Sequence, residues 1–318
     1  MEIRKDPFTG EYILVSPHRL KRPWQPEGAC PFCPGAPETG RGWDVLILPN
    51  RYPVVTENPP EPTAEDLYEV IPARGSSLVV VETPQHDVDD LSDLPLGQIK
   101  KILTAVAEAQ RKAEKEGNAA YFLFFRNKGK EIGVSLTHPH SQIYILPVVP
   151  PRVRAELQAS YEWYVKHGSC LHCCIVEKEE KRLVFQNRNW KAFVPFYAKW
   201  PHEVHIYPKR HRSLLTELTD EEVADLAEAL KITLCALKQV AGIPMPYIMV
   251  LHQAPLRRPT QYYHLHFEIY GMYRPDGKLK HAAGAELGAS LFTLDTTPEE
   301  TAARIKAALQ KCLKHSAD

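Results

Sequence analysis

The sequence predicts an α+β protein in which antiparallel sheets with flanking helices occur as two repeats of one unit. Three observations support this fold class. Short runs rich in Val, Ile, Phe and Tyr outnumber the segments with helical periodicity. Apolar residues recur every three or four positions in only three long segments. The order of cysteine, histidine and strand motifs in the first half returns in the second half.

The three helical segments are expected at residues 96–116, 220–240 and 298–313. Two of them have clear start signals. Thr219 precedes the second helix and Glu222 follows three positions later, while Thr297 precedes the third helix together with Pro298 and Glu300. A capping box of this kind satisfies two backbone N–H groups and is worth about 1 kcal/mol.

Strands are expected in nine runs that are separated by proline-rich loops. Proline breaks helices and removes a donor from a sheet, so the stretches 22–34 and 58–62 are expected to be ordered loops. The nine runs are residues 11–15, 45–48, 78–81, 121–125, 142–146, 184–196, 204–207, 247–251 and 264–270.

The two repeats are expected to form two domains, residues 1–152 and 153–318. In each half a Cys-x-x-Cys motif precedes a strand pair that ends in a histidine, and a helix, a strand and a His-x-His motif follow. The single histidines stand 125 positions apart, at 86 and 211, and the His-x-His motifs 126 positions apart, at 138 and 264. Such near-equal offsets over unrelated landmarks indicate two copies of one fold.

The bulk composition excludes several classes of function. With 318 residues, 44% of them hydrophobic, the chain is long enough for two cores. Lys plus Arg equals Asp plus Glu at 39 each, so no net positive field attracts nucleic acid or an anionic membrane. Apolar runs fall far short of the roughly 20 residues of a membrane helix, and no apolar signal segment follows the N-terminus. We therefore expect a cytoplasmic protein with no nucleic-acid partner and no membrane partner.

The seven cysteines point to metal binding more than to a disulfide framework. Two pairs have the spacing of metal ligands, Cys30-Pro31-Phe32-Cys33 and Cys170-Leu171-His172-Cys173. Cys235 and Cys312 lie in helical segments and are expected to be plain thiols. Cys174 is either a spare thiol or an oxidisable one, and the sequence leaves both readings open.

The segment His138-Pro139-His140-Ser141-Gln142 is the strongest candidate for chemistry. Alternate residues of a strand share a face, so His138, His140 and Gln142 are expected to converge on one surface. The loop 127–133, which contains two glycines and two lysines, has the composition of a phosphate-binding loop. Each feature alone has a plainer explanation, a chance histidine pair on a solvated strand and an ordinary surface turn.

Taken together, the motifs resemble the galactose-1-phosphate uridylyltransferase family, whose members contain two repeats of the histidine-triad superfamily. The resemblance covers nearly the whole chain, and its separate motifs occur in the family's order. They are residues 13–19 with 21–24, residues 127–129 and 138–142, residues 194–196 with 200–201, and residues 251–255 with 264–266.

The resemblance implies a double displacement through a covalent nucleotidyl-histidine. His140 would attack the α-phosphorus of UDP-glucose, expel glucose 1-phosphate, and pass the uridylyl group to galactose 1-phosphate. Gln142 would donate a hydrogen bond to a non-bridging phosphoryl oxygen. For Nε2 to attack, Nδ1 must carry the proton, and the family holds it there with a backbone carbonyl that the sequence does not identify. Glu268 follows the second His-x-His motif and would repel a phosphate, so that motif is expected not to be catalytic.

The resemblance also implies structural zinc, which we expect at two ions per chain. Two arrangements compete for the second ion, and because both contain His264 they are expected to exclude each other. The cysteine set is preferred, since Cys-x-x-Cys binds zinc more avidly than a carboxylate does. A Cys170–Cys173 disulfide is a further alternative. The first ion would bind Cys30, Cys33, His86 and His138; the second would bind Cys170, Cys173, His211 and His264, or, as iron or zinc, Glu156, His252, His264 and His266.

The resemblance identifies the residues that would contact the nucleotide sugar and the hexose 1-phosphate less completely. The chain departs from the family at Arg51, where an aspartate is expected, at Ser141 for glycine, and at Ala285 and Phe292 for tyrosine and glutamine. These departures leave the base and the hexose open and keep a nucleotide-sugar phosphorylase, acting on ADP- or UDP-glucose with the same histidine, as the alternative. A non-enzymatic zinc-binding interaction module is a weaker rival, and a homodimer is expected. The implied substrate-binding residues are Arg19, Arg22, Asn50, Asn127, Lys128, Gly129, Ser135, Lys280 and Glu286.

Overall fold

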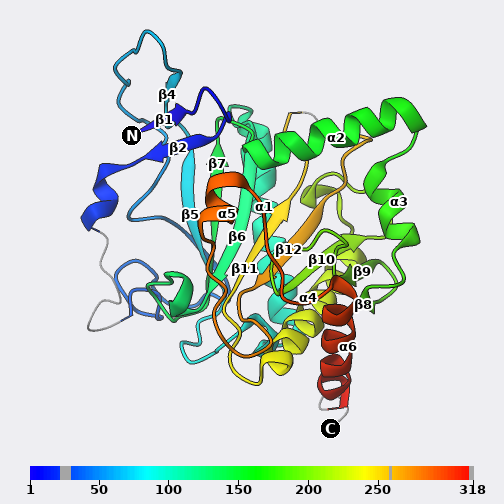
Figure 1. The fold of residues 1–318 in the computed structure, drawn as a ribbon. Helices are drawn as coiled ribbons and strands as arrows, with labels where there is room; N and C mark the ends of the chain where they lie inside the picture. The colour runs from blue at the N-terminus through cyan, green and yellow to red at the C-terminus, as the bar shows by residue number, and fades with distance from the viewer. Residues whose placement is uncertain (22–29, 258–259, 315–318) are drawn as a thin grey trace.

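A nine-stranded antiparallel sheet forms the centre of the molecule in the computed structural model, which describes residues 1–21, 30–257 and 260–314 (Figure 1). A second sheet of three short strands lies beside its N-terminal part, in the order β2 (Tyr12–Val15), β1 (Glu2–Lys5) and β4 (Val70–Pro72). The nine strands, in spatial order, are β3 (Leu46–Pro49), β5 (Ser76–Val81), β7 (His140–Leu146), β6 (Tyr121–Lys128), β11 (Tyr247–His252), β12 (His266–Gly271), β10 (His202–Pro208), β9 (Trp190–Phe193) and β8 (Leu183–Gln186).

The strand order confirms that one unit occurs twice. The halves meet where β6 pairs with β11, and outward from this junction the order is β6, β7, β5, β3 on one side and β11, β12, β10, β9 on the other. A long helix precedes the junction strand in each half, α1 (Leu96–Glu116) before β6 and α4 (Asp220–Ala241) before β11. Both halves share one continuous sheet, and the domain boundary at residues 152 and 153 stays a prediction.

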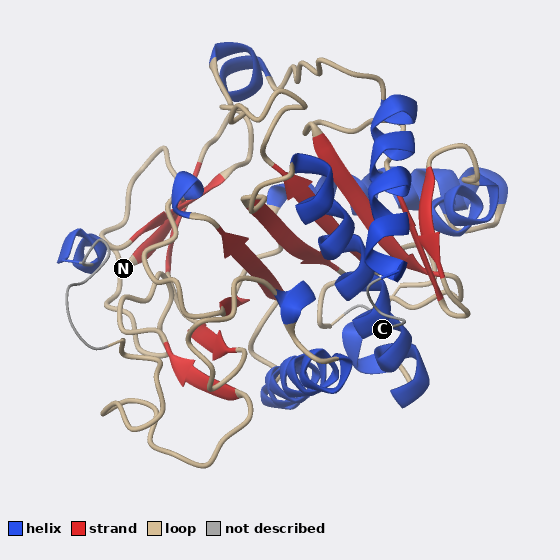
Figure 2. Cartoon of the chain, turned by 90° about the horizontal axis from the view of Figure 1, so that it is seen from below, coloured by secondary structure: helices blue, strands red, loops and turns tan. Residues whose placement is uncertain are grey.

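The main core lies between one face of this sheet and the helices α1 and α4. Ile99, Leu103 and Val106 of α1 are buried in the same cluster as Phe122 and Phe124 of β6. The second repeat packs Leu226, Leu230, Leu234 and Leu237 of α4 in the same way. In the view from below, strands, loops and a short helix lie near the N-terminus, whereas long helices lie near the C-terminus (Figure 2). None of the described helices combines the length and the apolar character that crossing a membrane would require.

The predicted helices and their caps are confirmed. α4 begins after Thr219, whose hydroxyl accepts from the N–H of Glu222 at 3.2 Å, while the Glu222 carboxylate accepts from the N–H of Thr219 at 2.8 Å. Thr297 and Glu300 exchange the same pair of bonds, at 2.9 and 3.2 Å, before α6 (Pro298–Lys314). Each of the nine predicted strand runs contains a strand, although residues 184–196 form two, β8 and β9, with a turn between them.

Three helices were not expected from periodicity: α2 (Pro151–His167), α3 (Leu171–Lys178) and α5 (Gly284–Ala289). α2 buries only Val153 and Ser160, so it lacks the apolar stripe by which a helix is recognised in a sequence. α3 and α5 are eight and six residues long, too short for a repeating pattern. The short strands β1 and β4 are absent from the predicted set as well.

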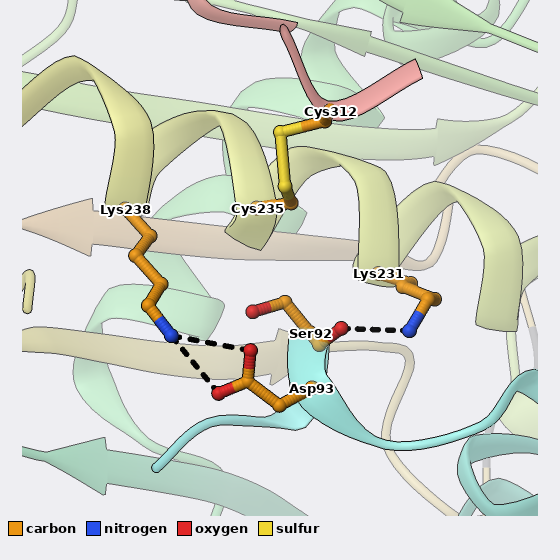
Figure 3. Close-up of a disulfide and its surroundings, with 6 residues drawn as sticks. All are labelled: Ser92, Asp93, Lys231, Cys235, Lys238 and Cys312. Atoms are coloured by element: carbon orange, nitrogen blue, oxygen red, sulfur yellow. Dashed lines mark hydrogen bonds and ion pairs between the residues drawn. A yellow bond between two sulfur atoms is a disulfide. The ribbon is translucent and has the colours of Figure 1, made fainter. Parts of the chain in front are cut away.

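The prediction that Cys235 and Cys312 are plain thiols is wrong, because they form a disulfide between α4 and α6 (Figure 3). Each cysteine fits the apolar pattern of its own helix, and their pairing depends on α6 packing against α4, which periodicity does not reveal. Next to the disulfide, Lys238 pairs with Asp93 at 3.0 Å, and Lys231 donates to the carbonyl of Ser92 at 2.7 Å. The last helix is therefore held to α4 covalently.

We expect Cys235→Ser to lower the free energy of unfolding by about 4 kcal/mol, because the disulfide closes a long loop in the unfolded chain. The two cysteines are 77 positions apart. Denaturant titration of the wild type and the variant, each with and without a reductant, measures the change. The reductant should shift the wild-type midpoint toward that of the variant and leave the variant unchanged. An unshifted wild-type midpoint, with both thiols shown to be reduced, would contradict the prediction.

Candidate active site

His140 is the first residue of β7, and it lies on the sheet face opposite α1 and α4. It pairs with Val81 of β5, and Gln142, two residues later, pairs with Val79, so both side chains share this face. The two side chains line a cavity of about 270 Å³ together with Phe32, Leu48 and other residues of the first repeat. The expected convergence of His140 and Gln142 is thus present.

The tautomer of His140 is set by the backbone of the same motif. Its Nδ1 lies 2.9 Å from the carbonyl oxygen of His138. A carbonyl only accepts, so Nδ1 carries the proton and the neutral ring has its lone pair on Nε2. The ring of Phe32 lies 5.4 Å from the half-buried His140 ring and limits its rotation. The carbonyl that the sequence left unidentified belongs to His138.

A second cavity, of about 480 Å³, meets the first at Ser135, Leu136 and His140. Four of the residues implied for the nucleotide line it. Gly129 has a φ of 107°, and a Cβ atom there would lie 2.7 Å from the Cβ of Pro246, so the loop requires glycine at this position. His140 therefore stands on a wall common to two cavities. The four residues implied for the nucleotide are Asn127, Lys128, Gly129 and Ser135.

The remaining implied substrate residues are distributed unevenly. Asn50 lines the first cavity, and Arg19 donates at 3.0 Å to the carbonyl of Tyr52, which also lines it. Arg22 lies outside the described residues. Lys280 and Glu286 form a buried ion pair at 2.9 Å, away from both cavities.

Several residues of the first cavity were missed by sequence reasoning. Glu38 pairs with Arg51 at 3.2 Å, and both line the cavity. Phe32 and Tyr52 line it as well. Phe32 had a usable signal, because it stands between the two cysteines of the first metal motif and must lie near His138 once that motif closes.

The first metal cluster joins Cys30, Cys33, His86 and His138, whose ligand atoms all lie within 4.8 Å of one another. The Nδ1 of His138 is 3.7 Å from the sulfur of Cys30 and 3.8 Å from that of Cys33. Its other ring nitrogen donates to the carbonyl of Thr83 at 2.8 Å, which orients the ring. Burial lowers the pKa of His138, so the ring is neutral, as a metal ligand must be.

The second metal cluster joins Cys170, Cys173, His211 and His264 in the same manner. The sulfur of Cys173 lies 3.3 Å from Nδ1 of His211 and 3.4 Å from Nδ1 of His264. Hydrogen bonds from Cys173 first, and then from His211 and His264, hold the pKa of Cys170 far below its ordinary value. Cys170 and Cys173 are free thiols, so the alternative disulfide between them is not formed.

A third group joins Glu156, His252, His266 and Glu268, and it corrects the expectation of two mutually exclusive second sites. Glu268 takes the place that was expected for His264, whose Nδ1 faces Cys173 instead. The cysteine set and the carboxylate set therefore share no residue. Along a strand, residues 266 and 268 lie on one face, so the next ligand after His266 is Glu268.

The third group carries its own neutralising cations. Arg152 contacts Glu268 at 2.9 Å and Glu156 at 3.5 Å, and His252 contacts Glu156 at 3.0 Å. Burial opposes the charge on His252, but Glu156 and Glu268 outweigh it and raise its pKa. The two carboxylates are thus balanced by an arginine and a histidine in this structure.

The second His-x-His motif has the same hydrogen bond from a histidine ring to a backbone carbonyl as the first, but its histidine ring is buried. The Nδ1 of His266 lies 3.0 Å from the carbonyl of His264, as His140 does from His138. The His266 ring, however, is only 1% exposed and stacks on Tyr207 at 4.5 Å. Its Nε2 faces Glu268 at 3.4 Å, which accords with the expectation that this motif is not catalytic.

Comparison with known proteins matches both halves of the chain to one family. The model for the N-terminal domain of galactose-1-phosphate uridyl transferase matches residues 1–150, and the model for its C-terminal domain matches residues 156–317. The chain is 36% identical to galactose-1-phosphate uridylyltransferase of Thermotoga maritima, over 96% of this chain and 98% of that protein. It is 30% identical to ADP-glucose phosphorylase of Arabidopsis thaliana, over 95% and 91%. A solved structure of a uridylyltransferase is 98% identical, with a TM-score of 0.95 over 98% of this chain and all of that one.

We expect two metal ions per chain, one in each cysteine cluster. Cys30→Ser should remove one ion, since the first cluster then has three ligands, whereas Glu156→Gln should retain both, because the third group is neutralised without a metal. Metal content of the purified variants by plasma mass spectrometry is the measurement. A third equivalent that is lost in Glu156→Gln would show that the third group binds metal.

Proposed function

The chain belongs to the galactose-1-phosphate uridyl transferase family, and on this basis we propose that it transfers a uridylyl group from UDP-glucose to a hexose 1-phosphate through a covalent intermediate on His140. The coarser statement, a nucleotidyltransferase of this family, follows from the family itself. One observation carries the finer proposal. His140, with its proton held on Nδ1 by the His138 carbonyl, stands on the wall that two cavities share.

The geometry supports an attack by Nε2 on the α-phosphorus of the nucleotide sugar. In the first step a bond forms from Nε2 to phosphorus, and the bond from phosphorus to the bridging oxygen breaks, so that the hexose 1-phosphate leaves with both bonding electrons. In the second step an oxygen of the acceptor phosphate attacks phosphorus and the bond to Nε2 breaks. The first leaving group is a stabilised anion and the second is a neutral imidazole, so neither step requires a strong general acid.

Polar groups around His140 can stabilise the charge that develops on the phosphoryl oxygens. Gln142 shares its strand face, and Ser135 lines both cavities. Lys128 and Lys130 line the second cavity, where Lys128 pairs with Asp89 at 3.0 Å. Preorganised donors of this kind gain strength where water is excluded.

We also propose that the first metal cluster binds zinc and serves the reaction by holding His138 in place. Two thiolates and two neutral imidazoles are the donor set that closes a structural zinc shell. The bound ion would supply no reacting group. Cys30, Cys33 and His86 would instead fix the side chain of His138, whose carbonyl sets the tautomer of His140. Zinc is proposed for the second cluster on the same donor chemistry.

Lys280 and Glu286 are proposed to contact the hexose in a homodimer. Neither residue lines one of the two cavities of its own chain, and we propose that they reach a hexose at the site of a partner subunit. Leu287 and Leu291, on and just after α5, are 79% and 66% exposed, as residues that await a partner surface are. The domain boundary at residues 152 and 153 is retained within this proposal.

A nucleotide-sugar phosphorylase remains the second candidate, since the chain is 30% identical to ADP-glucose phosphorylase of Arabidopsis thaliana. The first cavity contains Arg51, paired with Glu38, at the position where the family resemblance calls for an aspartate. Such an enzyme would form the same adduct on His140 and pass the nucleotidyl group to inorganic phosphate. The acceptor therefore separates the two candidates.

We expect His140→Ala to lower the rate of nucleotidyl transfer by at least about 10³-fold, because the nucleophile is removed. The wild type mixed with UDP-glucose should gain one uridylyl group, visible by mass spectrometry of the intact protein and located on His140 by peptide mapping. The adduct should be stable to base and labile to acid. Normal transfer by the variant would contradict the assignment, and a protein that forms no adduct with any nucleotide sugar would favour a binding module.

The isolated adduct distinguishes the two acceptors. We expect galactose 1-phosphate to discharge it with formation of UDP-galactose, and inorganic phosphate to leave it intact. Parallel loading with UDP-glucose and ADP-glucose compares the two bases. Discharge by phosphate alone would replace our first candidate with the phosphorylase.

A further inference from the structure

We propose that Glu82 is a positioning residue for the nucleophile, and that it holds the backbone on both sides of His140 through a buried network with Ser141 and Arg126. The inference rests on the proposed function, because it assigns a role to residues that support His140. None of the three belongs to a metal cluster, and Glu82 and Ser141 line neither cavity.

Glu82 contacts the two residues that flank His140 in the chain. Its backbone N–H donates to the carbonyl of Pro139 at 3.1 Å. Its carboxylate accepts a short hydrogen bond from the hydroxyl of Ser141. Glu82 directly follows Val81, the residue of β5 that pairs with His140. One residue therefore fixes the strand before and after the nucleophile.

Arg126 of β6 fixes the carboxylate of Glu82 in turn. Its Nε lies 3.0 and 3.1 Å from the two carboxylate oxygens, and its Nη1 donates to the hydroxyl of Tyr247 at 2.7 Å. Tyr247 of β11 donates to Asp90 at 2.6 Å. The network thus spans the four adjacent strands β5, β7, β6 and β11, and it crosses the junction of the two repeats.

All members of the network are buried and their charges are matched. Glu82 is fully buried, Ser141 is 1% exposed and Arg126 is 2% exposed. Burial alone would lower the pKa of Arg126, but Glu82 and the other partners raise it above the ordinary value, so the guanidinium is charged. A carboxylate paired with a fixed guanidinium is held rigidly, because neither buried group can exchange this ion pair for hydrogen bonds with water.

The second repeat places apolar residues at the matching positions. Gln142 pairs with Phe125, and its counterpart Glu268 pairs with Val250. One position along each strand, Ser141 and Arg126 therefore correspond to Phe267 and Leu251, which are fully buried in the main core.

This difference argues that the network serves positioning. A buried ion pair can usually be replaced by well-packed apolar residues without loss of stability, and the second repeat shows that this fold accepts such residues here. The polar version occurs in the repeat whose histidine is accessible. Misplacement of a reacting group by about 1 Å can cost 10²-fold in rate, so an anchor on both sides of His140 has a kinetic value that packing alone would not give.

Ser141→Ala tests the inference in the full-length protein with its metals bound. It removes the hydroxyl and leaves Glu82 paired with Arg126. We expect the single-turnover rate of adduct formation on His140 with UDP-glucose to fall roughly 10- to 100-fold, while the UDP-glucose concentration at half-maximal rate stays within about two-fold, because Ser141 touches neither cavity. Ser141→Thr, which restores a hydroxyl, should recover part of the rate.

Ser160→Ala is the matched control. Ser160 is also 1% exposed, and its hydroxyl contacts His172 at 3.0 Å in the second repeat. Its loss removes a comparable buried hydrogen bond and should leave the rate of adduct formation unchanged. Thermal unfolding and metal content of both variants are measured alongside.

The outcomes separate this inference from the proposed function. A wild-type rate in Ser141→Ala, or an equal loss in Ser160→Ala, would overturn the positioning role while the adduct on His140 still upholds the transferase. A wild type that forms no adduct with any nucleotide sugar would overturn both. A slow Ser141→Ala at unchanged half-maximal concentration, with Ser160→Ala at the wild-type rate, supports the inference.

Discussion

The hydrogen bond from Nδ1 of His140 to the carbonyl of His138 is the interaction on which the site depends. It places the lone pair of the neutral ring on Nε2. The acceptor is itself fixed, because the side chain of His138 belongs to the first metal cluster and also donates to the carbonyl of Thr83. A single residue therefore links the first metal cluster to the tautomer of His140, the proposed nucleophile. Any movement of His138 within the cluster would also move the carbonyl that accepts from Nδ1 of His140.

The same hydrogen bond from histidine Nδ1 to a backbone carbonyl occurs in both repeats, so the repeats differ in the residues that surround this bond. His266 bonds to the carbonyl of His264 as His140 does to that of His138, and each repeat has its own cysteine cluster beside the motif. Around His140 two cavities meet, whereas Tyr207 covers the ring of His266. The duplicated fold thus gives both histidines the same backbone geometry. The side chains around each histidine decide whether a ligand can reach it.

Patterns within short stretches of sequence predicted most of the fold and the cysteine pairs of the two clusters, and the family resemblance implied the histidines of the first cluster. Contacts between distant residues account for what was missed. α1, α4 and α6 each carry a repeating apolar face, and the Cys-x-x-Cys spacing marks its own ligands. The Cys235–Cys312 disulfide depends on how two helices pack, and no local pattern contains that information. The exchange of Glu268 for His264 in the third group arises because His264 precedes β12 and its Nδ1 faces Cys173. Ser141 appeared only as a departure from the family until its contact with Glu82 gave it a partner.

The placement of carboxylates differs between the two histidines. In the first repeat, Glu82 does not share the face of His140, and its charge is neutralised by Arg126. The face of β7 that carries His140 also carries the uncharged Gln142. In the second repeat, Glu268 shares the face of His266. Arg152 lies 2.9 Å from the Glu268 carboxylate and pairs with it, and Tyr207 stacks on the His266 ring at 4.5 Å. The second histidine therefore faces ion pairs under an aromatic side chain, whereas His140 faces an uncharged amide on the wall of a cavity. This difference supports the proposal that phosphate chemistry is confined to one half of the duplicated fold.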